Sequence, residues 1–372
     1  TGGTIDITAE DDVTFGVEGD VLGVDGTVTV TADSNGGSGG AVTMADGAII
    51  NAGSGTIDID ADENITLGSI QTTDNTGAAV AIDSANGGVV DGGGADVDIV
   101  ADSASAVVTI TTATGIGNAA GSGADNAIET TVDTLNASVT GTGSIDIDET
   151  NAIVLVDVDT NNGSIQVDAG GQLTATDVAS TTDNNANDIT LTTTAGDILV
   201  NLINAGAAGD VTLLNTGAGI EETAADNTAD ITADDLRMEA VDGVGNDGEI
   251  EIAVSDLAVT TASGDITLVD TAGGLTITTI TTAGASITAG AAGDDIIIRA
   301  ESPLTVDSAV TNTGGGDITL AAEGNTVTDD LDINANVTAT GGDGAISLFA
   351  GDSIDVDAAV TVSTVGSGTI LV

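Results

Sequence analysis

Carboxylates are the only reactive side chains that this sequence contains in large numbers. Its 372 residues include 60 Asp and Glu, no His, Cys, Trp or Tyr, and two cations, Arg237 and Arg299. General acid–base catalysis near neutral pH relies mainly on His, and covalent catalysis needs an activated nucleophile beside a base. We therefore expect no catalytic residues and no enzyme activity.

One acidic segment begins like a calcium-binding loop. Asp58, Asp60 and Asp62 alternate along the chain as the first ligands of an EF-hand do. An EF-hand also needs Gly at the sixth position and Glu at the twelfth. Glu63 and Ser69 stand there instead, so Asp58, Asp60 and Asp62 are calcium candidates without the complete motif.

A second segment comes closer to the calcium-loop pattern. Asp157, Asp159 and Asn161 alternate in the same way, Gly163 follows one residue late, and the twelfth position is Asp168. Asp157, Asp159, Asn161 and Asp168 are therefore also candidate calcium ligands. We expect no required cofactor, with Ca²⁺ as the one ion that the chain could bind.

Paired carboxylates could also hydrolyse glycosides. A polysaccharide-active enzyme would need clustered Asp with a cation or an aromatic ring nearby, for instance around Arg237 or Arg299. The chain has only two Phe for ring stacking, and most Asp occupy polar positions of alternating segments. A solvated strand face is the favoured interpretation.

A short pattern recurs along the chain, in which a Gly is followed by a polar residue and then by apolar residues that alternate with polar ones. Alternation with period two is typical of strands with one buried face. Intervals between neighbouring copies include 20 residues, from 143 to 163, and 29 residues, from 26 to 55. Copies include 3–7, 26–30, 55–59, 143–147, 264–268 and 316–320.

Self-similarity at this spacing predicts stacked coils, each of which cannot bury its apolar face alone. We predict an all-β, right-handed parallel β-helix (β-solenoid) of about sixteen irregular coils, forming a rod about 75 Å long. Composition does not shift along the chain, so residues 1–372 are expected to form a single continuous solenoid that is part of a longer chain or filament.

Motifs such as Gly264-Asp265-Ile266-Thr267-Leu268 and Gly316-Asp317-Ile318-Thr319-Leu320 resemble the coils of repeat-rich bacterial exoproteins. These are the filamentous-haemagglutinin-like, two-partner-secreted surface proteins. The resemblance implies a β-solenoid exposed on a bacterial surface, and it extends over nearly the whole chain.

The net charge of −58 limits the partners. Nucleic acids and anionic membranes attract Lys and Arg, so neither is expected to bind. No apolar run is long enough to span a membrane, and no signal peptide opens the sequence, which suggests a mature chain or a fragment. Stacked carboxylates repel, so we expect stability that depends on cations.

These features favour an extracellular structural role. The leading hypothesis is a shaft of a bacterial surface fibre, filament or sheath, built by head-to-tail stacking of the chain with itself. The alternative is a calcium-dependent cell-surface adhesin, in which loops at 118–126 or 35–40 bind glycans of a host or neighbouring cell and the solenoid is a spacer.

Overall fold

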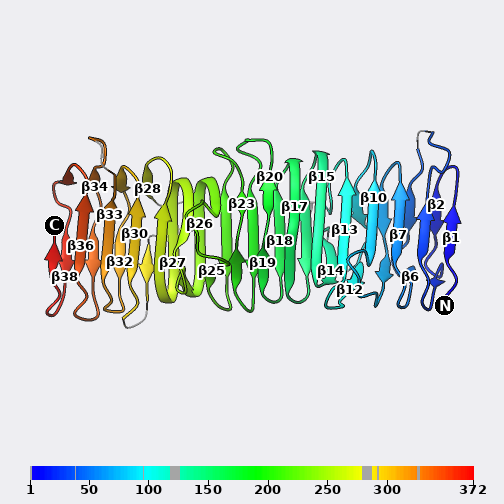
Figure 1. Ribbon diagram of the computed structural model, residues 1–372, viewed down its shortest axis with the longest axis horizontal. Coiled ribbons are helices and arrows are strands. Elements are labelled where there is room, and N and C mark those ends of the chain that lie inside the picture. Colours follow the sequence, from blue (N-terminus) through cyan, green and yellow to red (C-terminus); the bar gives the residue numbers. More distant parts are fainter. Residues whose placement is uncertain are drawn as a thin grey trace. The chain divides into compact units, whose positions relative to one another are not determined.

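A computed structural model describes residues 2–37, 39–94, 96–117, 126–278, 287–290, 293–324 and 327–372. These residues have an all-β parallel solenoid fold, with about 14 turns in total and without a helix (Figure 1). The described segments accordingly contain no helix that could cross a membrane. The predicted all-β parallel β-solenoid is confirmed. The turns are fewer than predicted because several are long: Leu135 pairs with Leu155 one turn later, but Ile266 pairs with Ile296.

The described residues divide into two compact units, and each is a solenoid by itself. The first unit comprises 1–182 and 186–188, and the second comprises 183–185 and 189–372. The continuity of one solenoid over the whole chain stays a prediction.

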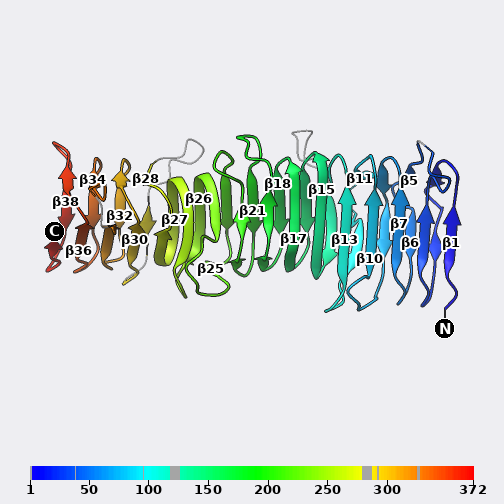
Figure 2. The ribbon, with the colours of Figure 1, turned by 45° about the horizontal axis from the view of Figure 1, so that its top comes forward.

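The first unit consists of parallel strand stacks in which each strand pairs with its counterpart one turn later (Figure 2). One stack contains β1 (Ile5–Thr8), β4 (Val28–Thr31), β7 (Ile57–Ala61), β10 (Val80–Ser84), β13 (Val107–Thr112), β15 (Thr134–Thr142) and β17 (Ile153–Asn162), and β17 pairs with both β19 (Leu173–Ala175) and β20 (Val178–Ser180). A second contains β2 (Val13–Phe15), β5 (Val42–Met44), β8 (Ile65–Leu67) and β11 (Val89–Asp91). A third contains β3 (Val21–Leu22), β6 (Ile49–Asn51), β9 (Ser69–Gln71), β12 (Ile99–Ala101), β14 (Ile128–Val132), β16 (Ile145–Glu149) and β18 (Ile165–Ala169).

The second unit repeats this scheme. It begins with β21 (Ile189–Thr193), β22 (Ile198–Val200), β23 (Ile203–Asn204), β24 (Val211–Asn215) and β25 (Ile220–Glu222), which lead into β26 (Ile231–Val244) and β27 (Ile250–Asp270). Three stacks follow: β28 (Leu275–Ile277), β31 (Leu304–Val306), β34 (Leu331–Ile333) and β37 (Ile354–Val356); β29 (Thr288–Ala289), β32 (Val310–Asn312), β35 (Val337–Ala339) and β38 (Val362–Thr364); and β30 (Ile296–Ala300), β33 (Ile318–Ala322), β36 (Ile346–Ala350) and β39 (Ile370–Leu371).

The core is aliphatic because strand alternation sorts the side chains. In β7, Ile57, Ile59 and Ala61 are buried, while Asp58 and Asp60 lie on the outer face. Parallel register places each of these residues beside its equivalent in the next turn, so Ile59 stacks between Val30 and Ile82. Repetition of this register makes the buried aliphatic column continuous from turn to turn.

The recurrent Gly before each strand is needed for close approach of the turns. A Cβ on Gly55 would lie 2.1 Å from Gly26 O, and a Cβ on Gly26 would lie 2.2 Å from Gly3 O. The motif glycines therefore stack on one another at the strand entries, where the backbone of the preceding turn leaves no room for a side chain.

The strands β26 and β27 are longer than the five-residue copies of the recurrent motif. Strand β27 pairs in succession with β28, β29 and β30. One uninterrupted strand therefore contributes to three stacks, and it continues through Gly264 before it pairs with β30.

Candidate metal centre

The first predicted calcium segment lies on a strand and its following turn. Asp58 and Asp60 are half-buried on the outer face of β7, and Asp62 lies in the turn that follows. Asp62 accepts a hydrogen bond of 2.6 Å from Asn86 Nδ2. Burial, followed by the charges of Asp58 and Asp83, raises the pKa of Asp60. The structure thus places Asp58 and Asp60 on one face, while Asp62 contacts a neighbouring turn.

The second predicted segment is divided between two strands. Asp157, Asp159 and Asn161 lie on β17. Asp168 lies on β18, where it is in register with Asp148 of β16. The residues of the near-EF-hand pattern therefore do not form one continuous loop, and their binding of calcium stays a prediction.

Carboxylates of successive turns do face one another on the outer surface. Burial, followed by the charges of Asp148 and Asp168, raises the pKa of Asp146 to about 6. The pKa of Asp148 is also raised, by burial and then by Asp168. The repulsion expected from stacked acids is therefore present at β16 and β18.

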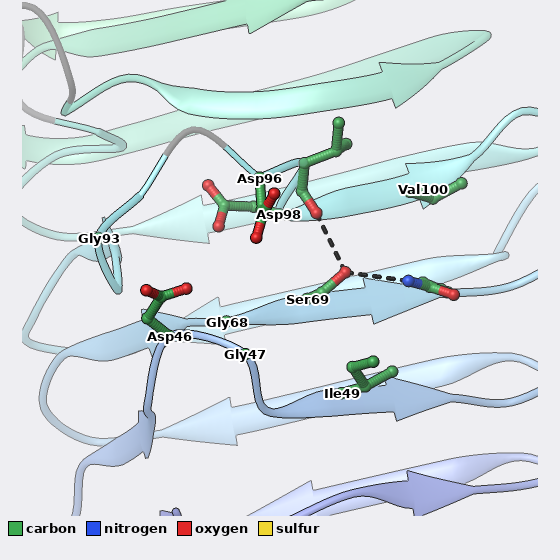
Figure 3. A pocket seen from close by; sticks show the side chains of 11 residues that line it. Asp46, Gly47, Ile49, Gly68, Ser69, Gly93, Asp96, Asp98 and Val100 are labelled. Atoms are coloured by element: carbon green, nitrogen blue, oxygen red, sulfur yellow. Dashed lines mark hydrogen bonds between the residues drawn. The ribbon is translucent and has the colours of Figure 1, made fainter. Parts of the chain in front are cut away.

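A group of three carboxylates, here called the first triad, meets in the first unit. Asp91 ends β11, Asp98 directly precedes β12 and Glu129 lies on β14, with one oxygen of each within 4.8 Å of the others. Asp98 is 2% exposed, and its Oδ2 accepts a hydrogen bond of 3.2 Å from Glu129 N. Burial, followed by the charge of Asp91, raises the pKa of Asp98 to about 9. Figure 3 shows Asp98 beside a cavity of about 280 Å³ that Asp46 and Asp96 also line.

A second triad lies in the second unit. Glu222 ends β25, Asp230 directly precedes β26 and Glu251 lies on β27, again with oxygens within 4.8 Å of one another. Asp230 N donates to Glu251 O (2.8 Å), and Asp230 Oδ2 accepts from Glu251 N (3.1 Å). Asp230 is 4% exposed and Glu251 is 2% exposed. Burial, countered by the bond from Glu251 N and reinforced by the charge of Glu222, raises the pKa of Asp230 to about 7.

The two triads have the same arrangement. In each, one acid ends a strand, another precedes the next strand, and the third is the second residue of a strand one turn later. Such a group can share a proton or hold a hard cation that prefers oxygen ligands. A third group among the described residues, Asp210, Asp234 and Asp235, is half-buried.

The sequence reasoning missed both triads, because their members are far apart in the chain. Strand alternation would place Glu251 on an outer face, between Ile250 and Ile252, yet all three residues are buried. The one usable signal is an acid at each end of the segment that joins two strands, at 91–98 and 222–230. That signal alone does not locate the third ligand.

The two Arg side chains already face carboxylates. Arg237 pairs with Glu239 on β26, and Arg299 of β30 pairs with Glu249. The Nε atoms of both Arg are buried without a hydrogen-bond acceptor among the described residues. Each guanidinium group is therefore committed to a local ion pair.

The predicted adhesive loops are described only in part. Residues 118–125 of the 118–126 loop lie outside the described residues, as does Ser38 of the 35–40 loop. In the second loop, Asn35 Nδ2 donates to Glu10 O (3.2 Å), and Gly37 N donates to side-chain oxygens of Asp33 and Asn35 (2.8 Å each). The described part of this loop is therefore held by Asn35 within it and by Glu10 and Asp33 outside it.

Comparison with known proteins returned no match to a protein-family model, a curated protein or a solved structure. The solenoid fold is established by the structure itself.

Proposed function

We propose that this protein is an extracellular structural solenoid, the shaft of a bacterial surface fibre, filament or sheath. The observation that supports this role is the parallel register itself, in which each turn is held to the next by backbone hydrogen bonds and a shared aliphatic core. A turn with this geometry is a template for a further turn. The filamentous-haemagglutinin-like motifs favour the same role.

Self-stacking would place the first turn of one molecule against β39 of another. Ile370, Leu371 and Val372 are 46%, 56% and 74% exposed, whereas the equivalent Ile346 of β36 is fully buried. Unpaired strand edges with apolar side chains recruit further strands. A second copy could supply β1, whose motif (3–7) matches the motif at 368–372. Head-to-tail stacking would then bury both.

Electron microscopy and sedimentation of the purified chain test this proposal. Long unbranched particles whose length grows with protein concentration are expected, with calcium and with chelator compared at matched ionic strength. Replacement of Ile370, which is in register with the buried Ile346, by Asp should abolish growth, because a charge would enter the aliphatic column of the new interface. Replacement of Val327, which is 82% exposed and outside any strand, by Asp is the matched control. Single particles of constant length under both conditions would refute self-stacking.

An adhesin on a solenoid spacer is the second candidate, and one feature favours it. Beside the described end of the 35–40 loop lies a hollow of about 690 Å³, lined by Asp62, Glu63, Asn64 and Asn86 among others. Carboxylate and amide groups of this kind can hydrogen-bond the hydroxyl groups of glycans. Glycan-array binding by single particles that is lost on Asn86→Ala would favour the adhesin over the shaft.

A further inference from the structure

The second triad contains a buried carboxylate whose charge is not satisfied by the protein. Glu251 is 2% exposed, and its Oε2 has no hydrogen-bond donor in the described part of the chain. The groups that face this carboxylate include oxygens of Glu222 and Asp230, within 4.8 Å. A buried acceptor in such surroundings requires a proton or a cation.

Neither Arg of the chain is available to neutralise the second triad. Arg237 pairs with Glu239 and Arg299 pairs with Glu249. A fourth carboxylate, Asp226, is close enough to raise the pKa of both Asp230 and Glu251 further. The site therefore concentrates negative charge without an internal counter-ion.

A shared proton would neutralise only part of this charge. It could bridge Asp230 and Glu251, which are already joined by the bond from Asp230 N to Glu251 O and by the bond from Glu251 N to Asp230 Oδ2, and it would leave Glu222 ionised beside them. A divalent cation can instead contact all three carboxylates at once. Ca²⁺ accepts six to eight oxygen ligands in flexible geometry, whereas Mg²⁺ demands a near-octahedral site and Zn²⁺ favours N and S ligands.

We propose that Glu222, Asp230 and Glu251 bind one calcium ion. Water would complete the coordination, since three carboxylates supply fewer oxygens than Ca²⁺ requires. The ion would tie the end of β25, the start of β26 and the second residue of β27 together, and so would link successive turns of the second unit. This site is independent of the proposed self-stacking, because all its ligands lie within one chain.

Isothermal titration of the chelator-treated full chain with CaCl₂ tests the site, in about 0.15 M KCl to screen diffuse binding to the acidic surface. Wild-type protein should show saturable calcium binding above the diffuse background. Glu251→Gln should bind one calcium ion fewer per chain, or should bind that ion at least tenfold more weakly. The same change at exposed Glu18, Glu18→Gln, is the matched control and should leave the isotherm unchanged.

Thermal unfolding followed by circular dichroism gives a second readout. Calcium should raise the melting temperature of the wild type and of Glu18→Gln more than that of Glu251→Gln. If Glu251→Gln does not fold, Glu222→Gln, which changes the half-buried ligand, should give the same loss. The proposal would be overturned if Glu251→Gln and Glu222→Gln both gave the same calcium-binding isotherm as the wild type. It would also be overturned by a wild type without saturable binding, which would mean that the triad holds protons only.

Discussion

Substitution of a motif glycine tests the stacking of the turns most directly. In Gly55→Ala the new Cβ would lie 2.1 Å from Gly26 O and 2.4 Å from Gly26 C, where contacts under 3.0 Å essentially do not occur. The backbones of two turns would have to separate by about 1 Å, against a ladder spacing of about 4.8 Å. Overpacking of this kind costs about 1–3 kcal/mol. We expect a loss of about 2 kcal/mol of unfolding free energy.

Gly77→Ala is the matched control, because a Cβ there meets nothing within 4 Å. It should be neutral or stabilising by up to about 1 kcal/mol through the reduced entropy of the unfolded chain. Urea unfolding should be followed by circular dichroism, since the chain lacks Trp and Tyr. Equal unfolding midpoints for Gly55→Ala and Gly77→Ala would refute the close-approach argument.

Three further predictions concern the core and the acids. Ile59→Ala should cost about 2–5 kcal/mol and Ile59→Val about 0.5–1.5 kcal/mol, because Ile59 is fully buried between two turns; equal urea midpoints for the two variants would contradict this. Burial is the main cause that raises the pKa of Asp98 to about 9 and of Asp230 and Asp270 to about 7. The folded state therefore binds more protons than the unfolded state above pH about 4, so with chelator present stability should fall between about pH 5 and pH 8; a rise in melting temperature over this range would contradict the assignment. Raising NaCl from about 0.1 M to about 1 M shortens the screening length to about 3 Å and should raise the melting temperature, whereas a decrease would argue against repulsion between stacked carboxylates.

Local pattern accounts for most of the fold. Alternation in 55–59 places Ile57 and Ile59 inside and Asp58 outside, and the structure has them so. Recurrence of the Gly-led motif predicts parallel stacking, since every copy presents the same apolar face. These features could be predicted because strand alternation and turn repetition depend on residues close together in the chain.

The number of turns and the course of β27 followed from longer-range geometry. Turns differ in length, as the pairs Leu135–Leu155 and Ile266–Ile296 show, because the segments that join the strands differ in length. The motif does not specify the length of these segments. Similarly, β27 passes through three stacks without a break, although the repeat predicts short strands.

The acidic residues that sequence spacing selects differ from those that the structure brings together. Sequence spacing singled out Asp58, Asp60, Asp62, Asp157, Asp159, Asn161 and Asp168, all within short segments. The triads instead join residues as distant as Asp98 and Glu129, which meet because parallel pairing brings a residue beside another one full turn away. Burial of Glu251 likewise depends on its neighbours from other turns. Composition and alternation specify which residues are acidic and which strands they accompany, but the stacking of turns decides which carboxylates share a buried space.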